Sequence, residues 1–172
     1  TLASIGYGTL TTFITLFSDA KGGGGGAFAL TLFSSAFVSM RLLFPDSINR
    51  FGGLQVALAC FAVEAVGLLM VWGAAVPLMA LLGATLTGAG FSLVFPALGV
   101  VAVKKLPPQN QGSALATYTA FLDLSLGITG PLAGILMTHA GVAAIYLASA
   151  FAVFLSGVLV LRLIPKEKSV EI

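Results

Sequence analysis

The chain has few charged side chains for its length, and this shortage excludes a water-soluble fold. Among 172 residues there are eight lysines and arginines and six aspartates and glutamates, together 8% of the chain. A soluble domain carries roughly 25%. The hydrophobic share is 58% and the mean hydropathy is +1.08, so most of this surface must face lipid.

Cysteine and histidine are almost absent, and several functions are excluded with them. Cys60 is the single cysteine and His139, which we expect in an outer loop, the single histidine. No intrachain disulfide and no metal-ligand spacing is possible, and we expect neither an enzyme nor a cofactor. The net charge of +2 is not gathered into a basic stripe, so we expect no nucleic-acid partner.

Six apolar runs follow one another along the chain, separated by short polar or glycine-rich segments. A spanning helix needs about 20 apolar residues, within a range of roughly 17–25. The predicted helices cover approximately residues 1–17, 27–44, 54–73, 77–103, 113–138 and 142–162. The run Gly22–Gly26 is typical of a flexible tether and has no other structural interpretation, and the sequence leaves its origin open. The sequence therefore predicts a single all-α integral membrane domain of six transmembrane helices.

Lysine and arginine are distributed unequally between the two ends of these spans. Seven lie on the side that holds both termini: Arg41, Arg50, Lys104, Lys105, Arg162, Lys166 and Lys168. The opposite side holds only Lys21. Because cytoplasmic loops carry an excess of these residues, we expect both ends of the chain to be cytoplasmic.

Two acidic residues lie inside the predicted spans. Asp123 is about ten residues into the fifth span, and Glu64 lies at a similar depth in the third. An ionised acid at the bilayer centre costs at least ~2.5–3.5 kcal/mol. Such a group faces a cavity, pairs with a cation or takes up a proton, so both residues are proton-coupling candidates.

Asp123 is the stronger candidate because of the helical face that it occupies. Spacings of three and four place on that face Thr119, Asp123, Gly127, Gly130 and Gly134. A small, polar face suits a cavity or a close helix contact, and Pro131 loosens the helix there by removing a backbone donor. The alternative is a protonated acid that bonds to a neighbouring helix.

Glu64 has less polar surroundings on its own helix. Its face carries Cys60, Gly67 and Val71. This pattern favours structural burial with a hydrogen-bonded partner, and a role in proton handling is the alternative.

Hydroxyl and aromatic side chains mark a candidate substrate cavity. They lie on the first, fourth and fifth spans: Tyr7, Thr11, Thr12 and Thr15; Thr87, Phe91 and Phe95; and Thr119. Such residues can line a pathway for a sugar or a similar solute, or they can bond across to neighbouring helices. We expect Pro96 to bend or break the fourth helix.

Two motifs resemble signatures of the major facilitator superfamily. Residues 45–53 resemble its loop signature G-x-L-x-D-R-x-G-R-R, which Arg50 and Gly52 match. Asp46 lies in this loop and Arg41 at its edge, whereas Pro45, Asn49 and Gly53 depart from the pattern, so we do not expect a full charge relay. The other motif resembles the antiporter signature G-x-x-G-P-x-x-G and comprises Gly127, Gly130, Pro131 and Gly134.

Two further phrases are similar to one bacterial subgroup, the arabinose-efflux-like or drug-efflux-like inner-membrane exporters. They are Gly6-Tyr7-Gly8-Thr9 and the stretch 90–99. The resemblance implies the C-terminal half of a twelve-helix transporter, built as a 3+3 inverted repeat, with the substrate at the interface of two halves. It also implies that the first and fourth spans line the cavity and that the third and sixth stand outside it.

The function implied is proton-coupled efflux of small organic solutes, such as sugars or drugs, by alternating access. A uniporter or importer of the same fold and a non-transporting membrane scaffold subunit are the alternatives. The chain begins inside a helical pattern, so we expect a second six-helix half. That half is fused, separate or a second copy.

Overall fold

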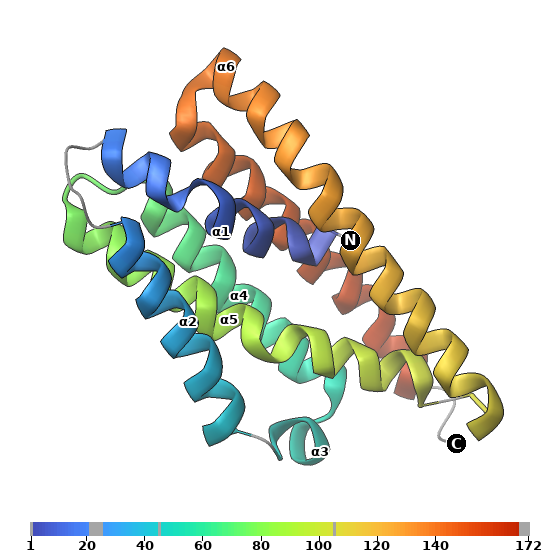
Figure 1. Ribbon diagram of the computed structural model, residues 1–172. Coiled ribbons are helices and arrows are strands. Elements are labelled where there is room, and N and C mark those ends of the chain that lie inside the picture. The colour runs from blue at the N-terminus through green and yellow to red at the C-terminus, as the bar shows by residue number, and fades with distance from the viewer. Residues whose placement is uncertain (1, 21–25, 45, 105, 169–172) are drawn as a thin grey trace.

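The structure is a computed structural model that describes residues 2–20, 26–44, 46–104 and 106–168, and within them only helices occur. The helices are α1 (Leu2–Ala20), α2 (Gly26–Leu43), α3 (Ser47–Phe51), α4 (Gly53–Trp72), α5 (Pro77–Val103) and α6 (Pro108–Lys168) (Figure 1). The side chains of Thr15 and of the lysines at 21, 105, 166 and 168 lie outside the described residues, as do Pro45 and the glycines at 22–25. The predicted all-α class is confirmed.

Helix α6 consists of two arms. Its 61 residues would be about 90 Å long as one helix, roughly three times the hydrocarbon thickness of a bilayer. Gly141 interrupts it with φ 82° and ψ 168°, and the chain reverses there into a hairpin (Figure 1). We call residues 108–140 the first arm and residues 142–168 the second arm. Together with α1, α2, α4 and α5 they give the six predicted transmembrane helices, which are confirmed.

Length and composition agree with membrane crossing. By these two criteria α2, α4, α5 and the part of α6 from Pro108 to Arg162 can each cross a bilayer. Large apolar side chains are exposed over the outside of the bundle, among them Leu42, Leu78 and Phe151 at 74%, 64% and 67%. A surface of this kind is stable only where lipid replaces water.

Helices α4 and α5 form the most tightly packed pair, and small residues allow it. A Cβ on Gly67 would lie 2.5 Å from the Thr87 hydroxyl, and one on Gly83 would lie 2.7 Å from the Gly67 carbonyl. The Thr87 hydroxyl donates to the Gly83 carbonyl at 2.9 Å, so its polar group is satisfied within α5. Helix α2 packs on α5, and the two arms of α6 cover α4 and α1.

Three local details differ from the predictions. The polar turn after α2 contains the five-residue helix α3, and α6 begins at Pro108 within the predicted loop 104–112. His139 is exposed but helical, because the chain stays helical up to Gly141.

Helix α5 continues through Pro96 without a break. A proline in a helix leaves the carbonyl four residues earlier without its usual donor. That carbonyl belongs to Ser92, and it accepts a hydrogen bond from Nη2 of Arg41 on α2 at 3.3 Å. The side chain of a neighbouring helix thus replaces the missing backbone donor.

Candidate functional site

The first arm of α6 has three distinct faces. One is packed against α1 and the second arm and buries Ser125, Thr129 and Ala133. A second carries large apolar side chains that are 44–59% exposed: Phe121, Leu124, Ile128, Leu132 and Ile135. The third is the face predicted from the sequence, and it lies between the other two. We call it the small face (Thr119, Asp123, Gly127, Gly130 and Gly134).

Among the described residues, no helix packs against the glycines of the small face. Asp123 is exposed and Thr119 half-buried. Nothing lies within 4 Å of a Cβ built on Gly127, Gly130 or Gly134. The large apolar face matches lipid, whereas a carboxylate among glycines does not. The two exposed faces of one helix therefore suit different surroundings.

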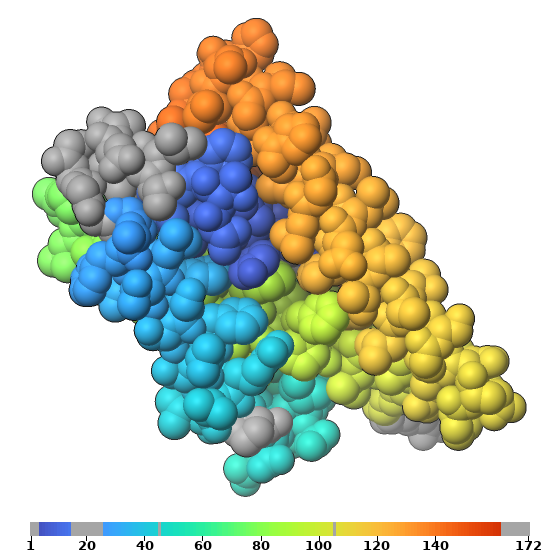
Figure 2. All heavy atoms as spheres, viewed as in Figure 1, coloured from blue at the N-terminus to red at the C-terminus, as the bar shows by residue number. Residues whose placement is uncertain are grey.

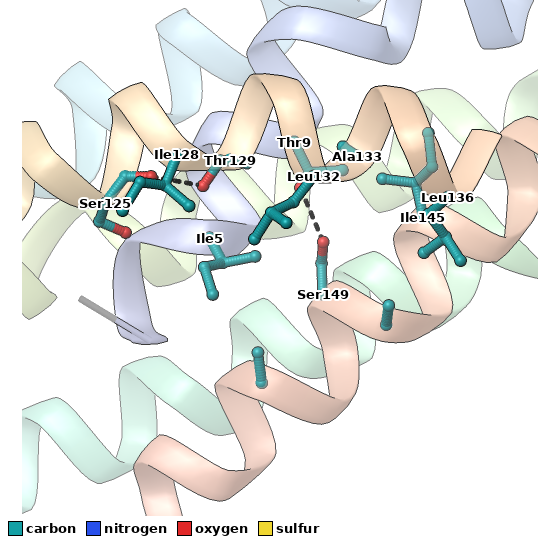
Figure 3. A pocket seen from close by; sticks show the side chains of 12 residues that line it. Ile5, Thr9, Ser125, Ile128, Thr129, Leu132, Ala133, Leu136, Ile145 and Ser149 are labelled. Carbon is teal, nitrogen blue, oxygen red and sulfur yellow. Dashed lines mark hydrogen bonds between the residues drawn. The ribbon is translucent and has the colours of Figure 1, made fainter. Parts of the chain in front are cut away.

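A pocket of about 230 Å³ lies between α1 and the two arms of α6 (Figure 3). Its lining is largely aliphatic, with four hydroxyl side chains: Thr9, Ser125, Thr129 and Ser149. The Ser149 hydroxyl donates to Oγ1 of Thr9 at 2.7 Å, and the Thr129 hydroxyl donates to the Ser125 carbonyl at 2.7 Å. The Thr9–Ser149 hydrogen bond links α1 to the second arm. These two hydroxyls therefore bond across to a neighbouring helix, which is the alternative to lining a solute pathway.

Four aromatic rings form a cluster that joins α1, α2 and α5. The rings of Tyr7 and Phe91 stack with centroids 4.8 Å apart, and Phe33 and Phe37 of α2 continue the cluster. The Arg41 guanidinium carbon lies 5.1 Å from the Phe37 centroid, a cation–π distance. Sequence reasoning missed Phe33 and Phe37, although their spacing of four from each other and from Arg41 indicates one helical face.

The predicted cavity residues divide into two groups. Tyr7, Thr11, Phe95 and Thr119 are half-buried and Thr12 is exposed. Thr87 is fully buried against α4, and Phe91 is 5% exposed within the aromatic cluster. Thr87 is thus placed in the α4–α5 contact and not on an open surface. Figure 2 shows α2, α1 and the first arm of α6 side by side on one face of the molecule.

The loop residues singled out from the sequence have separate roles. Arg41 ends α2 and reaches α5, as described above. Asp46 precedes α3, where its carbonyl accepts from the Arg50 amide at 3.0 Å, and both side chains are exposed. Gly52 connects α3 to α4 with φ 86°, a conformation that favours glycine.

Glu64 is fully buried, and neither carboxyl oxygen has a hydrogen-bond partner among the described residues. Gly6 of α1 lies directly against Oε1, and the Gly90 backbone of α5 lies against the Glu64 amide. The predicted burial is present, and no hydrogen-bonded partner occurs among the described residues. Burial next to α1 also departs from the expectation that this helix stands apart from the cavity-lining spans.

No group of three or more potential metal ligands occurs among the described residues. The helix bundle with its exposed apolar surface is that of an integral membrane protein, and its one unpacked, acid-bearing helix face is a candidate functional site. The comparisons with known proteins identify the family. Residues 1–171 match the profile of the Major Facilitator Superfamily. The chain belongs to this superfamily, and the resemblance drawn from the sequence is confirmed.

Curated relatives agree with this assignment. The chain is 67% identical over 162 residues to the "Uncharacterized MFS-type transporter YhhS" of Salmonella typhimurium, covering 94% of this chain and 40% of that protein. It is 65% identical over 171 residues to the protein of the same name from Escherichia coli O6:H1, covering 99% of this chain and 42% of that protein. The chain therefore spans less than half the length of these relatives. No solved structure matches it significantly.

Proposed function

We propose that this chain is the C-terminal half of a proton-coupled antiporter that exports small organic solutes by alternating access. The observation that carries the proposal is the exposed carboxyl of Asp123 on the small face of α6. A carboxylate in a spanning helix marks an ion or substrate pathway unless it is paired. Among the described residues, nothing lies within 4 Å of the Cβ positions of the three glycines that share this face, which leaves room beside the carboxyl for a partner from outside this half.

A backbone acceptor supports the same face. Pro131 cannot donate to the carbonyl of Gly127, one helical turn beyond Asp123. A carbonyl in the membrane needs a donor from a neighbouring helix, a side chain or water. Two acceptors thus point to a donor-bearing partner, such as hydronium, water, a cationic solute or a side chain of the other half.

The second six-helix half supplies the missing surface. The curated relatives extend well beyond the matched region, since it covers 40–42% of their length. Glycines at spacings of three and four allow close approach of another helix. We place the solute between the two halves, against Tyr7, Thr11, Thr12 and Thr119, where hydroxyls and an aromatic ring suit sugars or amphipathic drugs. The membrane is the bacterial inner membrane, with both ends of this chain cytoplasmic.

The test uses the full-length transporter in proteoliposomes with an imposed pH gradient. Flux of a panel of sugars and cationic drugs is compared between the unaltered protein, Asp123→Asn and the control Asp46→Asn, whose carboxyl is exposed outside the spans. We expect gradient-driven flux to disappear only in Asp123→Asn. Flux down the solute gradient without any pH response would favour a uniporter, and absence of flux for every solute would favour a scaffold.

A further inference from the structure

The Glu64 carboxyl is a buried acid with no counterion among the described residues. It is 0% exposed, and both oxygens lack hydrogen-bond partners in the same part of the chain. A buried ionised carboxylate is very costly unless it is paired and hydrogen-bonded. The neutral, protonated form is therefore the form that this packing accommodates.

The helix that covers the carboxyl is α1. A Cβ at Gly6 would collide with Oε1, and it would also lie 2.9 Å from Leu68 Cδ1 and 3.1 Å from Val153 Cγ2. Gly6 is therefore the position at which α1 fits over the carboxyl. The next residue, Tyr7, stacks on Phe91 in the aromatic cluster, which belongs to the proposed solute side. One short segment of α1 thus touches Glu64 through one residue and the aromatic cluster through the next.

Few ionisable groups surround Glu64. On α4 itself, Cys60 is a titratable group one helical turn earlier, and it is buried. Helix α5 contains no ionisable side chain, and the part of α1 with described side chains has only Tyr7. On the second arm of α6, Tyr146 lies two turns before Val153 and is buried. No cation faces Glu64 from these segments, so protonation is the available means of neutralising it.

A groove on the outside of the bundle approaches the turn of α4 that carries this acid. It has a volume of about 440 Å³, lies against α2, α3, α4 and α5, and has an almost entirely apolar lining, with Ser47 and Gln55 near α3. Cys60 and Gly90 also line it; Cys60 is one helical turn from Glu64, and the Gly90 backbone contacts the Glu64 amide. Glu64 itself is not a lining residue, so its carboxyl is separated from the groove while α1 stays in place.

We propose that Glu64 is a proton-binding site whose protonation holds α1 in place over α4. Loss of the proton to water leaves a carboxylate that must be hydrated. Hydration requires the contact between Gly6 and Oε1 to open, so α1 moves away and Tyr7 moves with it. This inference rests on the proposed proton-coupled function. It identifies α1 as the helix that moves when Glu64 releases its proton.

The test uses the purified full-length transporter in lipid nanodiscs, with two readouts over a pH series. Infrared difference spectra detect the carbonyl stretch of a protonated carboxyl, and hydrogen exchange, corrected for its intrinsic pH dependence, detects opening of α1. We expect the unaltered protein to lose a carboxyl band and to increase exchange in α1 at least ~fivefold over the same pH interval. Glu64→Gln, which mimics the protonated acid in shape, should lack both changes, and the control Asp46→Asn, whose carboxyl is exposed outside the spans, should keep both.

A second variant keeps the test decisive even if the Glu64→Gln protein does not fold. Gly6→Ala places a methyl group against Oε1, so exchange in α1 at low pH should rise to the level that the unaltered protein shows at high pH. A pH step that survives in Glu64→Gln, or normal α1 protection in Gly6→Ala, overturns the inference. If the unaltered protein shows proton-driven flux but no pH-dependent increase of hydrogen exchange in α1, this inference is overturned and the proposed function is left intact. If hydrogen exchange in α1 increases with pH but no proton-driven flux occurs, the proton-binding role of Glu64 is supported and the proposed function is contradicted.

Discussion

The guanidinium of Arg41 donates to the backbone carbonyl of Ser92, the carbonyl that Pro96 leaves without a helical donor. The Ser92 hydroxyl in turn donates to the Phe37 carbonyl at 2.6 Å, so two hydrogen bonds run between α2 and α5 at this level. The arginine at the membrane edge is therefore part of the interhelical contact as well as a topological signal.

Replacing Arg41 with Gln should destabilise the protein by about 1–3 kcal/mol, because a buried carbonyl loses its donor. Pro96→Ala in the same chain should restore most of the loss, since an alanine supplies the backbone N–H that the proline lacks. Thermal unfolding of the full-length protein in detergent measures both effects. Arg50→Gln, on the exposed surface of α3, is the control and should change stability little. Equal losses with and without Pro96→Ala would contradict the pairing.

Gly67→Ala should be destabilising by about 1–3 kcal/mol through overpacking. The new methyl group would meet the Thr87 hydroxyl and backbone of α5 at 2.5–2.6 Å. Gly112→Ala serves as the matched control, because nothing lies within 4 Å of its Cβ position. The measurement is the midpoint of thermal unfolding, and a similar midpoint for the two variants would mean that α4 and α5 pack less closely than described.

Gly127→Leu should weaken the contact between this half and the second half. We expect little effect on the packing within this half, because nothing among the described residues lies within 4 Å of its Cβ position. The adjacent residue provides the control: Ile128→Phe enlarges the large apolar face, where Ile128 is 44% exposed. Transport and thermal stability of the full-length protein should fall for Gly127→Leu and stay near normal for Ile128→Phe. Equal tolerance of both would indicate that lipid covers both faces.

The hydrogen bond between Ser149 and Thr9 can be measured by a double-mutant cycle with Thr9→Val and Ser149→Ala. Hydrogen bonds between membrane helices contribute about 0.6 kcal/mol on average. At 2.7 Å between buried hydroxyls, we expect a coupling energy of about that size or larger. Additive effects of the two substitutions on unfolding would show that the bond contributes nothing net.

Much of the fold follows from local patterns in the sequence. The lengths of the apolar runs predicted the spans. The gap between the predicted spans 113–138 and 142–162 contains Gly141, whose backbone conformation (φ 82°) is one that glycine favours. Helix α3 was missed because a segment of five residues is too short to show a helical period. The acceptor role of Ser92 toward Arg41 was missed because the two residues are 51 positions apart.

The candidate site was only partly predictable, for a related reason. The small face of α6 is a property of one helix, so spacing alone identified Asp123 and the glycines around it. The surroundings of Glu64 depend on Gly6, Gly90 and Val153 from three other segments. The apolar face of its own helix, where Cys60, Gly67 and Val71 are all buried, was enough to predict that Glu64 is buried. It could not show that Glu64 has no hydrogen-bond partner among the described residues. Thr87 was assigned to the cavity because its helix was, although its side chain points to α4.

The single-residue break at Gly141 has a consequence for how this protein enters the membrane. With no intervening loop, the first and second arms of α6 are about as closely joined as two antiparallel spans can be. Neither arm can insert and remain alone across the bilayer while the other stays in water, because the connection offers no slack. We therefore expect the two arms to enter the lipid together as one hairpin, and the turn between them to expose little chain to proteases or antibodies.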